Sequence, residues 1–129
     1  MVYVDTSVVL AQLLAEDMAP PERLWNETLI SSRLLEYETW NRIHALRLRD
    51  SHGEDVRKLL GRIAFLELIS PVVSRALDPF PVPVRTLDTL HLASIDFLLK
   101  QSQQVQVATY DDRMIKAVRK LRFSIYPLG

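Results

Sequence analysis

The sequence contains no cysteine, few glycines and no surplus charge of either sign. The lack of cysteine excludes disulfides and thiolate zinc sites, and it fits a reducing compartment such as the cytoplasm, where we expect the protein to act. The glycines, Gly53, Gly61 and Gly129, are too far apart to form a glycine-rich phosphate loop. The formal net charge is zero. Overall charge therefore gives no indication of a nucleic-acid partner.

Long hydrophobic runs are also missing. No uninterrupted apolar stretch approaches the ~18 residues that suggest a membrane-spanning helix, and Asp5 comes too early for a signal peptide. We therefore expect no membrane association. The length of 129 residues and the hydrophobic fraction of 48% predict a single globular domain over residues 1–129.

Short apolar segments alternate with helical patterns along the chain. We predict strands at 2–5, 28–31, 66–69, 105–108 and 123–126. We predict helices at 7–15, 33–50, 54–64, 72–77, 87–100 and 111–121, with a short helix between Pro20 and Glu27 and a break at 51–53. This alternation predicts an α/β fold, a central and mostly parallel sheet of about four to five strands with helices on both faces.

Acidic residues follow two of the predicted strands. Asp5 comes directly after Val2-Tyr3-Val4, and Asp111 and Asp112 follow the strand at 105–108. Ligands bind at the carboxyl edge of open α/β sheets, so these positions suit a functional site. Each acid has a simpler interpretation as a helix N-cap or first-turn residue, where a cap stabilises a helix by about 1 kcal/mol.

The helix at 33–50 carries two acids that its geometry separates. At about 100° per residue, Glu38 lies on a largely apolar face and Glu36 points to solvent. The alternative for Glu38 is a surface ion pair with Arg42 at i,i+4, which contributes a few tenths of a kcal/mol. Glu38 is the stronger candidate for a functional role.

The helix at 87–100 is apolar around most of its circumference. Asp96 belongs to its polar stripe, whereas Asp88 lies among apolar residues. A buried carboxylate needs a partner or a ligand, although a first-turn acid also interacts favourably with the helix dipole. We interpret His91, one turn after Asp88, as a packed, hydrogen-bonded histidine rather than a catalytic one.

Together the acids predict a metal site. A cluster of carboxylates without a compensating lysine repels itself, and Mg²⁺ or Mn²⁺ bound through oxygen ligands relieves that repulsion. Such a site supports metal-assisted phosphodiester cleavage. Two groups of basic residues are either solvated helix faces or contacts to an RNA backbone. They are Arg42, Arg47, Arg49, Arg57, Lys58 and Arg62, and then Arg113, Lys116, Arg119, Lys120 and Arg122.

Four segments that contain these acids resemble the motifs of the PIN-domain family, and specifically its VapC-type toxins. They are Val4-Asp5-Thr6-Ser7-Val8, Ser32 to Glu38, Arg85-Thr86-Leu87-Asp88-Thr89-Leu90-His91-Leu92-Ala93, and Thr109-Tyr110-Asp111-Asp112. The third is close to the family's R-x-L-D-A-x-H-L-A segment, with Thr89 where alanine is common. The motifs occur in the family's order and span nearly the whole chain.

The resemblance implies a PIN-like fold and a Mg²⁺- or Mn²⁺-dependent endoribonuclease. Asp5, Glu38, Asp88 and Asp111 would be its catalytic, metal-binding carboxylates. Support would come from Thr6, Ser7, Thr109 and Asp112. The resemblance also implies a homodimer and a cognate VapB-type antitoxin.

Two other interpretations remain open. The chain could be a non-catalytic PIN-like module that binds RNA or a protein. It could also be a phosphatase-like enzyme with Asp5 as nucleophile, although that chemistry usually requires a second acid two residues later, where this chain has Ser7.

Overall fold

The sheet lies at the centre of the fold. The computed structural model describes residues 1–15 and 17–129, and this part of the chain forms one sheet of five strands. The strands are β1 (Val2–Val4), β2 (Leu29–Ser32), β3 (Ile63–Leu66), β4 (Gln106–Ala108) and β5 (Ser124–Ile125). Their order is β3-β2-β1-β4-β5, and every neighbouring pair is parallel. The predicted α/β class is confirmed, with a sheet that is entirely parallel.

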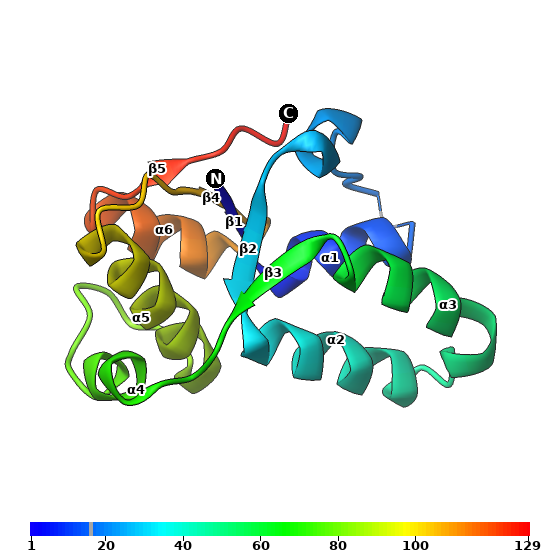
Figure 1. Cartoon of the computed structure of the whole chain (residues 1–129), viewed down its shortest axis with the longest axis horizontal. Coiled ribbons are helices and arrows are strands. Elements are labelled where there is room, and N and C mark those ends of the chain that lie inside the picture. The colour runs from blue at the N-terminus through cyan, green and yellow to red at the C-terminus, as the bar shows by residue number, and fades with distance from the viewer. Residues whose placement is uncertain (16) are drawn as a thin grey trace.

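Helices cover both faces of this sheet (Figure 1). They are α1 (Thr6–Leu13), η1 (Glu22–Asn26), α2 (Arg33–Ala45), α3 (Arg49–Leu60), α4 (Ser70–Ala76), α5 (Thr86–Lys100) and α6 (Asp112–Lys120). Side chains alternate along β1, so Val2 and Val4 belong to the core cluster with α1, α2 and α3, while Tyr3 packs with α5 and α6. Among the described residues, no helix is long and apolar enough to span a bilayer.

The strand order creates a topological switch point beside β1. The chain moves from β1 to β2 and β3 on one side, and β4 and β5 lie on the other side. Crevices at such points, outside the carboxyl ends of the strands, are the usual ligand sites of open α/β sheets. Asp5 follows β1, and Thr109 follows β4, so both residues lie at this point.

The prediction of one helix over 33–50 was wrong. Helix α2 ends at Ala45, and the amide of Leu48 donates to the carbonyl of Ile43. Arg47 adopts a φ of 56°, the left-handed conformation that closes many helices. The break predicted at 51–53 was also wrong, because α3 begins at Arg49 and includes Gly53. Helix interiors tolerate a glycine at a cost of about 1 kcal/mol.

The strand predicted at 66–69 begins three residues earlier than expected. Helix α3 ends at Leu60 with Gly61 as its C-cap, four residues before the end predicted at 64. Ile63 is then buried and pairs with Leu29, which brings the apolar segment Ile63–Leu66 into the sheet as β3. Helix α4 likewise begins at Ser70 rather than 72, with proline in its first turn, where no amide donor is needed.

Candidate active site

Asp5 is held firmly at the end of β1. The residue is only 5% exposed. One carboxylate oxygen accepts a hydrogen bond from the amide of Thr6 at 2.8 Å, and the other accepts from the hydroxyls of Ser7 at 2.9 Å and Thr109 at 2.8 Å. The N-cap interpretation is therefore correct as local structure. The two further hydroxyl donors go beyond what a cap needs, and this many donors does not suit a free nucleophile.

Glu38 reaches the same place from α2. Its Oε1 accepts a hydrogen bond from the Thr6 hydroxyl at 2.8 Å and lies 2.6 Å from Nε2 of His91. Thr6 therefore bridges Asp5 and Glu38. Glu36 instead forms an ion pair with Arg33 at 3.3 Å. The helix geometry separated the two acids correctly, and Glu38 does not depend on Arg42 for its contacts.

His91 connects Glu38 to Tyr3 of the central strand β1. The ring is 1% exposed, and its Nδ1 lies 2.7 Å from the hydroxyl of Tyr3, which also accepts a hydrogen bond from the amide of Ser32 at 3.2 Å. In the neutral imidazole, the Tyr3 hydroxyl donates to Nδ1 and the Nε2 proton is donated to Glu38. The expectation of a packed, hydrogen-bonded histidine is confirmed. Its partner is one of the candidate acids.

The charges around His91 favour its protonated form. Burial opposes protonation of the ring, but the hydrogen bond with Glu38 and the negative charges of Asp5, Glu38 and Asp88 outweigh it and raise the pKa of His91. The acids around His91 therefore shift its protonation equilibrium toward the imidazolium form.

Asp88 lies in the first turn of α5, near enough to Asp5 and Asp111 for their charges to act on it. Burial, followed by the charges of Asp111 and Asp5, raises the pKa of the Asp88 carboxyl group. Its one hydrogen bond, from the amide of Arg85, is long at 3.4 Å. Asp88 therefore does take part in the N-terminal cap of α5, as the first-turn interpretation expects. Its raised pKa reflects burial first and the neighbouring acids second.

Asp111 extends the group from the end of β4. Its Oδ1 caps α6 by accepting from the amides of Arg113 and Met114, and its own amide donates to the Thr109 hydroxyl at 3.0 Å. Thr109 therefore joins the backbone of Asp111 to the carboxylate of Asp5. Asp112 is exposed, and within the described residues it forms no hydrogen bond with this group.

The donor chemistry of the group fits a hard cation. Across residues 1–15 and 17–129, no three acidic or histidine side chains are already arranged as a metal-binding group. However, the candidate donors are all carboxylate oxygens, the ligands that Mg²⁺ and Mn²⁺ prefer. Burial and then the charges of Asp111 and Asp5 raise the pKa of Asp88, and a bound cation would stabilise its ionised form. Assignment of Asp5, Glu38, Asp88 and Asp111 as metal ligands stays a prediction.

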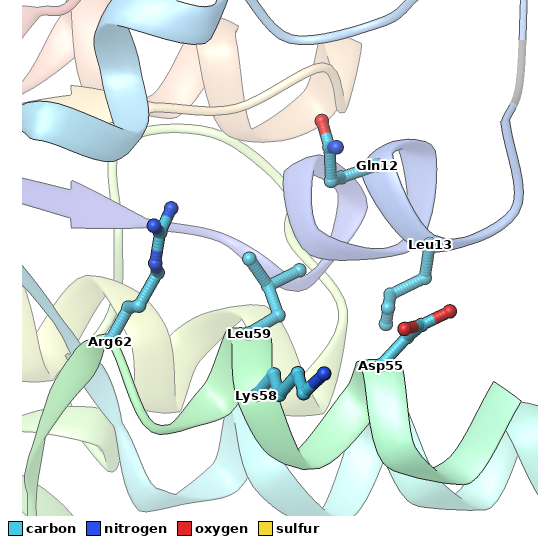
Figure 2. A pocket seen from close by; sticks show the side chains of 6 residues that line it. All are labelled: Gln12, Leu13, Asp55, Lys58, Leu59 and Arg62. Atoms are coloured by element: carbon cyan, nitrogen blue, oxygen red, sulfur yellow. The ribbon is translucent and has the colours of Figure 1, made fainter.

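A separate hollow of about 580 Å³ lies between α1 and α3 and is unrelated to these acids. Figure 2 shows Leu13 of α1 and Asp55, Lys58 and Leu59 of α3 around it, with Arg62 at one end. None of the candidate acids lines it. The candidate active site is the set of four acidic side chains at the sheet edge.

Tyr3 is the member of this network that the sequence did not single out. The pattern Val2-Tyr3-Val4 marks it only as a buried strand residue, and it is fully buried. Its contact with His91 spans 88 positions in the sequence, so no local pattern could reveal it. A tyrosine among strand valines was the available signal, since a buried hydroxyl needs a hydrogen-bond partner.

Comparison with known proteins agrees with the motifs and the fold. The family model of the PIN domain matches residues 2–121. The chain is also 28% identical to "Ribonuclease VapC47" of Mycobacterium tuberculosis (strain CDC 1551 / Oshkosh), over 95% of this chain and 93% of that protein. The resemblance seen in the four motifs is thereby confirmed at the level of the family. With its parallel sheet, its motif order and this match, the chain belongs to the PIN-domain family.

Proposed function

We propose that this protein is a metal-dependent endoribonuclease and the toxin of a VapBC-type toxin–antitoxin pair. The observation that most supports the proposal is the hydrogen-bonded linkage of Asp5 to Glu38 through Thr6 and to the backbone of Asp111 through Thr109. Asp88 is near enough for the charges of Asp5 and Asp111 to act on it. The name of the similar mycobacterial protein supports ribonuclease activity. A cytoplasmic location, a homodimer and a VapB-type antitoxin partner are parts of the same proposal.

Under this proposal, Mg²⁺ or Mn²⁺ held by the four carboxylates would supply an acidified water and offset charge on the scissile phosphate. The chain's own residues prepare the acids for this role. Thr6, Ser7 and Thr109 fix both oxygens of Asp5. Such hydrogen bonds orient ligating carboxylates, and losing them commonly costs about 10–100-fold in metal affinity or activity.

His91 and Tyr3 orient the second acid. The Nε2 of His91 contacts one oxygen of Glu38, while Tyr3 fixes the ring from its other nitrogen. Thr6 contacts the same Glu38 oxygen. The chain therefore restricts where the remaining oxygen, Oε2, can point.

A non-catalytic PIN-like module remains the second candidate. It is favoured by one observation, that the described residues contain no metal-binding group already in place. This candidate predicts RNA or protein binding without cleavage and without Mn²⁺ affinity at the acids.

The test compares RNA cleavage by the purified full chain and three variants in buffer with Mn²⁺. D5N and E38Q remove candidate ligands, whereas E36Q changes a neighbouring acid that pairs with Arg33 instead. We expect cleavage to be lost in D5N and E38Q and kept in E36Q. Undiminished cleavage by D5N contradicts the proposal, and absence of cleavage by every protein, the unaltered chain included, favours the binding module.

A further inference from the structure

A groove runs from the candidate active site along both sides of Tyr110. The first hollow, about 750 Å³, is lined by Ser7, Leu10, Arg42, Tyr110 and Asp111. A second, of about 520 Å³, includes Thr109, Tyr110 and Arg119. The two hollows share Asp17, Met18 and Tyr110, so they adjoin each other. Each volume lies in the ~300–1,000 Å³ range of ligand sites.

Tyr110 occupies a fixed position relative to Asp5. Its amide donates to the hydroxyl of Ser7 at 3.0 Å, and that hydroxyl donates to the Asp5 carboxylate at 2.9 Å. The ring packs on the core cluster that contains Ala108 and Tyr126, and it is partly exposed. The ring is therefore a supported aromatic surface that does not have to be ordered when a ligand binds.

The groove carries both signs of charge, and its two arginines can contact a polyanion beside the acids Asp17 and Asp111. Arg42 lines the first hollow and Arg119 the second, and within residues 1–15 and 17–129 neither forms an ion pair. Asp17 borders both hollows. A carboxylate there can accept a hydrogen bond from the amino group of a nucleobase, as acidic residues accept one from cytosine. An aromatic ring with an arginine in each adjoining hollow is an arrangement that suits single-stranded nucleic acid, which binds by base stacking and by backbone contacts.

We propose that this groove binds the RNA next to the cleaved bond, with a base stacked on Tyr110 and a phosphate held by Arg42. The inference rests on the proposed ribonuclease function and adds the path of the substrate. Asp111 belongs both to the first hollow and to the candidate acids, so a strand in this hollow would have its scissile phosphate beside them. The Ser7 bridge fixes the distance between the stacked base and Asp5.

The test measures binding of a fluorescein-labelled single-stranded RNA oligonucleotide of mixed sequence by fluorescence anisotropy. The D5N background prevents cleavage, so this readout does not depend on nuclease activity. Y110L removes the aromatic ring, Y110F keeps it, and R42Q removes the charge. The matched controls are Y37L and R49Q, which change exposed residues outside both hollows.

We expect Y110L to weaken RNA binding roughly 5- to 150-fold, the usual effect of losing one stacked base, while Y110F and both controls stay within about twofold. R42Q should lower the slope of log affinity against log salt by about 0.7. Arg42 is exposed, so its variant remains informative even if Y110L fails to fold.

Two results would overturn the inference. If Y110L is folded and both Y110L and R42Q bind RNA like their controls, the groove serves a peptide or protein partner instead. If R42Q retains the salt slope of R49Q, Arg42 does not bind phosphate. Either result leaves the cleavage test of D5N unaffected, so this inference can fail while the ribonuclease proposal stands.

Discussion

Replacing Thr109 with valine tests whether hydroxyl contacts hold Asp5 in place. Valine has nearly the same shape as threonine but cannot donate to Asp5 at 2.8 Å or accept from the amide of Asp111 at 3.0 Å. Thr109 is 5% exposed, so water does not readily replace its hydroxyl. The matched control is T109S, which keeps the hydroxyl and loses only a methyl group.

The expected loss of stability follows from these two contacts. A hydrogen bond to a charged group contributes about 1.5–3 kcal/mol, and an ordinary one about 0.5–1.5 kcal/mol. Asp111 is partly exposed, so its amide should recover some of its loss from water. We therefore expect T109V to lower the free energy of unfolding by about 3 kcal/mol and the melting temperature by roughly 10 °C. A domain with ordinary stability remains folded after such a loss.

Two measurements on T109V and T109S decide the question. Urea denaturation gives the free energy of unfolding, and Mn²⁺-dependent cleavage of RNA gives the activity of the folded fraction. We expect T109V to lose about tenfold or more of the activity, because Asp5 loses one of its three donors. If T109V equals T109S in both stability and activity, the hydroxyl does not position Asp5 and the reasoning is refuted.

The other predictions concern the charges of the site. D88N should raise the melting temperature of the metal-free protein at pH 7. Burial and repulsion from Asp111 and Asp5 raise the pKa of Asp88, so ionisation of Asp88 destabilises the fold. An unchanged or lower melting temperature in calorimetry contradicts this prediction. H91Q should lose a pH-dependent part of the stability. The pKa of His91 is raised in the folded state. The contribution of His91 to the free energy of unfolding is therefore fully present below about pH 6.5 and is lost as the pH rises through the raised value. A difference in unfolding free energy between H91Q and the unaltered protein that is the same at every pH refutes this prediction. EDTA should abolish RNA cleavage and Mn²⁺ should restore it, as gel assays would reveal; cleavage that persists in EDTA argues against a metal.

Helix periodicity and strand patterns in the sequence predicted where most of the candidate acids lie. The face of α2 that carries Glu38 was correct because the period of an α-helix is fixed, and Glu36 was correctly placed toward solvent. Asp5 and Asp111 were correctly placed at neighbouring strand ends, because parallel strands share one carboxyl edge.

The errors arose where tertiary contacts decide the local structure. Arg47 takes a left-handed conformation that its residue type does not signal, so the end of α2 was missed. Gly53 was read as a helix breaker but lies inside α3. The contact between Tyr3 and His91 joins β1 to α5 on one face of the sheet, and only the fold brings such distant positions together.

Titration of Mn²⁺ into the full chain and into D5N tests the central claim most directly. We predict that the unaltered chain binds Mn²⁺ and that D5N binds it at least about tenfold more weakly. D5N replaces the carboxylate on which the donors from Thr6, Ser7 and Thr109 converge. Equal Mn²⁺ affinity of the two proteins, or no binding by the unaltered chain, would contradict the claim that these acids form a metal-dependent ribonuclease site.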